Sequence, residues 1–273
     1  MSRRPRPVGE CHLCGVVGPL SFEHVPPEAA YNNRGVLRVT LEELMRTTLE
    51  GQPRGKVQQR GAGAYTLCGR CNNNTGAWYG ADFVEFCRLA MAVLQASGGR
   101  PTSIPVTRVR PLRILKQIIA MFHSLCGPGF GGGGVLRRFV LDKGRTGLPA
   151  AFRVFVYFAV GPRVRYAPLM VSASVRGPRD LRVMSEIAFP PLGYLLAMDS
   201  PPPDGRLAEI THFARCGYDE VKSWEVRLPV LPTVTSESGD YRTPQEVAEA
   251  GRRNARIRPR PGRGLDQPPP SAG

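Results

Sequence analysis

Two cysteine pairs are the strongest structural signal in this sequence: Cys11-His12-Leu13-Cys14 and Cys68-Gly69-Arg70-Cys71. Two cysteines separated by two residues can bind one metal ion, and two such pairs supply the four thiolates of a tetrahedral zinc site. We therefore predict that Cys11, Cys14, Cys68 and Cys71 bind one structural zinc ion. The alternative is four unligated thiols.

A more particular pattern accompanies the two pairs. The stretch Ser21-Phe22-Glu23-His24-Val25-Pro26-Pro27 lies between them, and Asn72 follows Cys71 directly. In this order the residues resemble the HNH endonucleases, and more narrowly their zinc-stabilised branch, a treble-clef arrangement in which two CxxC knuckles clamp a ββα-metal unit. The resemblance extends from Cys11 to about Trp78 of the 273 residues. It departs from the family at one position, because the middle Asn, which fixes the loop of the general base, falls here on Gly63.

The resemblance implies a metal-dependent endonuclease. By it, Glu23 ligates a catalytic Mg²⁺ or Mn²⁺, His24 is the general base, and Asn72 is a further ligand of the catalytic cation. Imidazole can be neutral and accept a proton at physiological pH, and an amide oxygen suits a hard cation. Adjacent residues of a strand point to opposite faces, so the family's arrangement requires Glu23 and His24 to lie at a strand end. The alternative is that they are an ordinary surface pair in an inactive zinc module.

The charge of the chain predicts its partner. The net charge is +15 and the isoelectric point is about 10.1, which favours a polyanion, most commonly nucleic acid. With the resemblance to nucleases, this predicts DNA as the partner. The basic ends, residues 1–7 and 252–263, are candidate phosphate contacts, and their alternative is solvated disorder without a dedicated role.

Cysteine usage and hydropathy predict the compartment. Seven cysteines, four of them in CxxC pairs, suit a reducing compartment and metal binding rather than disulfides. No apolar run reaches the length of a membrane span, and the basic N-terminus has no apolar segment typical of a secretory signal. We expect a cytoplasmic protein.

The pattern of apolar residues predicts an α+β protein. We expect a disordered basic N-terminus over 1–9, an HNH-like zinc domain with a following helix over 10–97, and a helix and Gly-rich joint over 98–134. A β-rich region of unknown role over 135–252 and a disordered basic tail over 253–273 complete the chain. The predicted helices are 41–50, 83–94, 111–126 and 243–252, and the loop is 51–63. The predicted strands are 17–25, 65–67, 152–158, 166–175, 187–198 and 225–231.

Three functions are compatible with these patterns. The first is a metal-dependent endonuclease, the second a non-catalytic zinc module that binds nucleic acid, and the third an interaction protein that uses zinc only for folding. Net charge favours the first two, and Glu23, His24 and Asn72 together favour the first.

Overall fold

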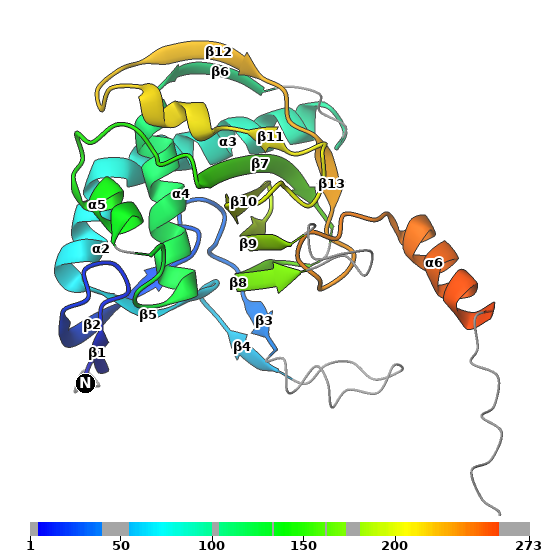
Figure 1. Ribbon diagram of the computed structural model, residues 1–273, viewed down its shortest axis with the longest axis horizontal. Helices are drawn as coiled ribbons and strands as arrows, with labels where there is room; N and C mark the ends of the chain where they lie inside the picture. The colour runs from blue at the N-terminus through cyan, green and yellow to red at the C-terminus, as the bar shows by residue number, and fades with distance from the viewer. Residues whose placement is uncertain are drawn as a thin grey trace, which may run out of the picture.

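The computed structural model describes residues 5–39, 55–99, 104–132, 134–161, 163–172 and 181–256 (Figure 1). Helices and strands both contribute heavily to these residues, so the predicted α+β class is confirmed. None of the described helices is long and apolar enough to cross a membrane.

The N-terminal part is an antiparallel sheet followed by a helix. The sheet has the order β1–β2–β5, with bounds Val8–Glu10, Val17–His24 and Gly63–Cys68. The chain then continues through α2 (Gly69–Thr75), the π-helical segment η1 (Gly76–Gly80) and α3 (Ala81–Ala96). The strands expected over 17–25 and 65–67 are therefore present, whereas the prediction of disorder over 1–9 was wrong for Val8 and Gly9, which pair with β2.

A second hairpin is inserted between β2 and β5. It consists of β3 (Val36–Arg38) and β4 (Lys56–Gln58). The prediction of a loop over 51–63 was wrong here, because Lys56–Gln58 pairs with a partner strand that local composition does not reveal. The helix predicted over 41–50 lies outside the described residues.

The helix α4 (Pro111–Cys126) occupies the centre of the molecule (Figure 1) and confirms the helix predicted over 111–126. It is buried around almost its whole circumference, because it packs between the N-terminal sheet and a larger C-terminal sheet. Its buried Lys116 donates from Nζ to the carbonyl oxygens of Phe139 (2.6 Å) and Asp142 (2.5 Å). These contacts hold α5 (Val135–Leu141).

Two elements in the middle of the chain were not predicted. The helix α5 buries Leu136, Phe139 and Val140, which have helical spacing, although we expected a β-rich region from residue 135. The strand β6 (Ile104–Val109) pairs with the distant β12 (Lys222–Val226). Such a long-range partner cannot be read from local pattern.

The C-terminal sheet has the strand order β11–β7–β10–β9–β8, and β13 (Val230–Pro232) adds to β7 in parallel. Strand β8 pairs with β9. The strand predicted over 187–198 is divided into two by the Pro190-Pro191 turn. A short 3₁₀ helix, η3 (Thr211–Arg215), follows β11. The bounds of the strands are Phe152–Val160 for β7, Arg165–Ser172 for β8, Arg182–Phe189 for β9, Leu192–Met198 for β10 and Ala208–Glu209 for β11.

Strand β7 is buried on both faces. Val154, Val156 and Phe158 belong to a core that also contains residues of the N-terminal unit, α3, α4 and α5. Phe155, Tyr157 and Ala159 point to the other face and form a second core with Leu231 and Tyr241. The first core therefore joins side chains from the three regions 10–97, 98–134 and 135–252.

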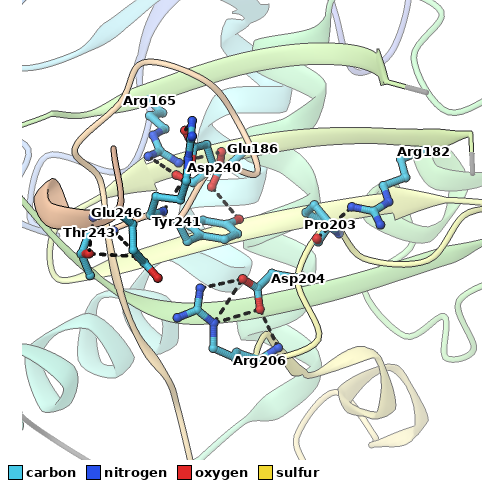
Figure 2. A network of polar contacts seen from close by, with 11 residues as sticks. Arg165, Arg182, Glu186, Pro203, Asp204, Arg206, Asp240, Tyr241, Thr243 and Glu246 are labelled. Carbon is cyan, nitrogen blue, oxygen red and sulfur yellow. Dashed lines mark hydrogen bonds and ion pairs between the residues drawn. The ribbon is translucent and has the colours of Figure 1, made fainter. Parts of the chain in front are cut away.

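A buried carboxylate organises the second face of the sheet (Figure 2). Glu186 of β9 is fully buried and accepts hydrogen bonds from the hydroxyls of Tyr157 (2.5 Å), Tyr241 (2.8 Å) and Ser238. The backbone N–H of Gly239 also donates to it, at 3.1 Å. Four donors thus replace the water that this carboxylate loses on burial.

The cation of this network is Arg165 of β8, whose Nη1 lies 3.6 Å from Glu186 Oε2. Arg165 also donates to the carbonyl oxygens of Thr235 (3.1 Å) and Asp240 (2.7 Å). Residues 233–242, the C-terminal strap, are thereby fastened to the sheet. The strap ends at α6 (Pro244–Arg256), where Thr243 and Glu246 exchange the hydrogen bonds of a capping box. The helix predicted over 243–252 is present, and the prediction of disorder from residue 253 was wrong for 253–256.

Arg165→Met should destabilise the protein by about 3–5 kcal/mol, because it leaves the buried Glu186 charge without its cation. Arg88→Met is the matched control: Arg88 is exposed and its ion pair with Glu85 lies on the surface of α3, so its loss should change stability by less than about 0.5 kcal/mol. Urea unfolding of the two variants measures the difference. Equal midpoints would contradict a structural role of the buried pair.

Candidate functional site

The four predicted cysteines lie together. Cys11 and Cys14 come from the turn between β1 and β2, Cys68 ends β5, and Cys71 lies in the first turn of α2. Their four sulfur atoms lie within 4.8 Å of one another, and Cys14 Sγ is 3.9 Å from Cys68 Sγ. This group could hold a metal ion such as zinc.

The backbone around the first pair is shaped to present sulfur atoms. Gly15 donates its N–H to the Cys11 carbonyl at 2.8 Å and has a φ of 77°, a left-handed conformation that favours glycine. The N–H of Cys68 donates to Cys11 Sγ at 3.2 Å, which connects the two pairs. The first contact fixes the turn that carries the pair, and the second stabilises negative charge on Cys11 Sγ.

The thiols of the group alter one another's pKa. A hydrogen bond from Cys71 lowers the pKa of the Cys11 thiol to about 4. The same contact with Cys11 raises the pKa of the Cys71 thiol far above its ordinary value, and burial raises the pKa of Cys14. This contact therefore favours the thiolate of Cys11 and the neutral thiol of Cys71. A bound divalent cation would offset the charge of further thiolates.

Glu23 lies on the inner face of β2, where α4 covers it. Its carboxyl is buried and accepts a hydrogen bond from Ser124 Oγ of α4 at 2.5 Å. Burial raises the pKa of Glu23 to about 8, a shift that the Ser124 hydrogen bond opposes. The carboxyl is thus protonated at neutral pH.

His24 lies on the opposite face of the strand, next to the ring of Phe22 at a centroid distance of 5.0 Å. Its Nε2 lies 2.9 Å from the carbonyl oxygen of Arg60. Since a carbonyl can only accept, Nε2 carries the proton and Nδ1 of the neutral ring has a free lone pair. The His24 side chain is partly exposed and is therefore in contact with solvent.

Asn72 in α2 is held against β2. Its Nδ2 donates to Ser21 Oγ and to the carbonyl oxygen of Phe22, both at 3.1 Å. The structure therefore brings Asn72 to the strand that ends in His24. Its amide oxygen fits a hard cation, but the enclosed acid of Glu23 does not fit the carboxylate ligand that the resemblance implies. In this arrangement Glu23, His24 and Asn72 do not all face one site.

A buried amide that no sequence motif marks fixes residues 25–32, the segment after His24 that is here called the His24 loop. Asn32 is fully buried, donates from Nδ2 to the carbonyl oxygens of Pro26 and Ala62, and accepts from the N–H of Ala62, each at 2.7 Å. This Asn32 clamp joins the segment after His24 to the segment that carries the Arg60 carbonyl. The resemblance to the HNH family places the Asn that fixes this loop at position 63. No side chain fits there, because a Cβ on Gly63 would lie 2.3 Å from the Glu23 carbonyl oxygen.

The C-terminal sheet also contacts this loop. Tyr166 of β8 donates from its hydroxyl to the carbonyl oxygen of Val25 at 2.6 Å. On the other side, His12 in the first cysteine pair donates from Nδ1 to the carbonyl oxygen of Ser124 at 2.9 Å. No motif in the sequence marks Asn32, Tyr166 or Ser124, because each acts on a backbone group or side chain that is distant in sequence.

Cys71→Ser should remove the bound metal and unfold the N-terminal unit, because metal binding and folding are coupled. Cys216→Ser is the control, since Cys216 lies outside the four-cysteine group. Elemental analysis of the purified proteins, with circular dichroism of each, measures both effects. Equal metal content in the two variants would contradict the assignment.

Glu23→Gln should make the protein more stable than wild type, by an amount that grows with pH. The folded-state pKa of about 8 lies above the ordinary value of 4.5. Between these values the folded state binds a proton that the unfolded state does not, so wild-type stability falls as pH rises. Gln keeps the shape without titrating, and the difference should reach several kcal/mol, at about 1.4 kcal/mol per pKa unit. Unfolding at pH 5 and pH 8.5, with zinc in excess, tests this; a constant difference would contradict it.

Comparison of the chain with protein-family models, with curated proteins and with solved structures finds no match.

Proposed function

We propose that this chain is a zinc-stabilised endonuclease of the HNH type, which hydrolyses phosphodiester bonds in DNA with His24 as its general base. The observation that carries the proposal is the hydrogen bond from His24 Nε2 to the Arg60 carbonyl at 2.9 Å. It selects the tautomer in which Nδ1 can accept a proton from water. The order of Cys11, Cys14, Glu23, His24, Cys68, Cys71 and Asn72 along the chain adds independent support.

The His24 site is pre-organised on both sides of the imidazole. The Arg60 carbonyl orients the ring and stabilises the positive charge that it gains on accepting a proton. The Asn32 clamp and the hydroxyl of Tyr166 fix the backbone on either side of this contact. A general base held in this way needs little rearrangement when it reacts.

Zinc has a structural role in this proposal. Four thiolates close a tetrahedral coordination sphere, which leaves no position for water or substrate. The N-terminal sheet is small, and zinc binding would add folding free energy to the core that it shares with α4.

HNH sites also use a divalent cation such as Mg²⁺ or Mn²⁺, which stabilises charge on the phosphate when bound. Of the residues implied by the resemblance, Asn72 suits such a cation and Glu23 does not. The proposal therefore assigns catalysis to His24 and leaves Glu23 as a buried neutral acid that joins β2 to α4.

The burial of Glu23 favours a second candidate, a zinc module that binds nucleic acid without cleaving it. Such a module needs the fold and the positive charge of the chain, but not an accessible carboxylate. It predicts salt-dependent DNA binding with no cleavage.

The His24→Ala variant decides between the two candidates. Removing a general base should lower the rate of plasmid nicking about 10²–10⁴-fold, while zinc content and DNA affinity stay near wild type. The assay compares wild type, His24→Ala and the control His212→Ala, each with and without Mg²⁺ or Mn²⁺. Equal nicking by wild type and His24→Ala, or none by either, would reject the nuclease and favour the binding module.

A further inference from the structure

The hairpin β3–β4, here called the ribbon, extends from the His24 loop away from the body of the molecule (Figure 1). Its two strands are antiparallel, with Leu37 opposite Val57 and Arg38 opposite Lys56. Leu37 and Val57 are 50% and 54% exposed, so the body of the protein does not cover their face of the ribbon.

The described residues of the ribbon carry positive charge. Arg34, Arg38, Lys56 and Arg60 are all exposed, and residues 31–39 and 55–62 contain no Asp or Glu. Within the described part of the chain, none of these four cations forms an ion pair. Arg38 and Lys56 lie directly opposite each other, and like charges in that position destabilise a strand pair. An anion bound across the two side chains would remove this repulsion.

The base of the ribbon lies at the His24 site. The Asn32 clamp closes it, and Arg60, which follows β4, supplies the carbonyl that orients His24. Phe22 and Tyr65, whose rings are 5.5 Å apart, lie partly exposed beside His24. A polyanion held along the ribbon would therefore lie close to the His24 imidazole.

We propose that the ribbon is the surface that binds duplex DNA, with Arg38 and Lys56 contacting backbone phosphates; this inference rests on the proposed function. A two-stranded antiparallel ribbon fits the major groove of B-form DNA. The major groove of A-form RNA is too narrow and deep for side chains to read. Duplex DNA is therefore the polyanion that suits the shape as well as the charge.

The test compares two double variants that remove the same charge. Arg38→Ala/Lys56→Ala removes the opposed pair of the ribbon. Arg88→Ala/Arg163→Ala removes two exposed arginines from α3 and from the segment before β8. Binding to a short DNA duplex is followed by fluorescence anisotropy over a range of salt concentrations, without added divalent cation. The melting temperature of each variant confirms that it is folded.

The ribbon variant should bind more weakly, and the slope of log K against log salt should fall by about two, one for each lost phosphate contact. The control variant should keep the wild-type slope. A wild-type slope in the ribbon variant, or an equal fall in both variants, would overturn the proposal. An equal loss of affinity for an RNA duplex would overturn the choice of partner.

The outcomes separate this inference from the proposed function. Wild-type protein that binds duplex DNA through the ribbon but does not nick it would support the ribbon and reject the nuclease. Nicking that depends on His24, together with unchanged binding by the ribbon variant, would support the nuclease and reject the ribbon. A wild-type protein with no affinity for DNA would reject both.

Discussion

The gathering of four cysteine sulfur atoms is the constraint on which the N-terminal half depends. It joins the turn after β1 to the junction of β5 and α2, although the two pairs are far apart in sequence. That junction in turn fixes Asn72 against β2 and sets the register in which β2 meets β5. His24 is the last residue of β2, and the pairing of β2 with β1 and β5 fixes its position.

Polar contacts connect this unit to the remainder of the molecule. Ser124 of α4 binds both Glu23 and His12, and Tyr166 of β8 binds the backbone at Val25. The C-terminal region, which has no motif of its own, therefore acts as a support for the His24 loop. The buried Glu186–Arg165 pair fastens the C-terminal strap to the second face of the same sheet.

The sequence pattern predicted those features that depend on the spacing and chemistry of particular residues. The helix over 111–126 was predicted correctly because its apolar spacing involves residues that are near in sequence, and the cysteine group because a tetrahedral metal site needs two pairs of thiolates even when the pairs are distant. The β6–β12 pairing, the β3–β4 hairpin and the Asn32 clamp were missed, because each depends on a partner that only the tertiary fold provides. The burial of Glu23 could not be predicted for the same reason, because Ser124, which contacts its carboxyl, lies on a helix that is distant in sequence.

The Asn32 clamp has a consequence for how this region can vary. It closes a long excursion of the chain at its base by holding Pro26 and Ala62 together. The entropy of closing a flexible loop grows slowly, by about 0.6 kcal/mol for each doubling of its length. Insertions or deletions beyond the clamp should therefore cost little stability and leave the imidazole where it is. The length of this excursion can therefore change while the geometry at its base is kept.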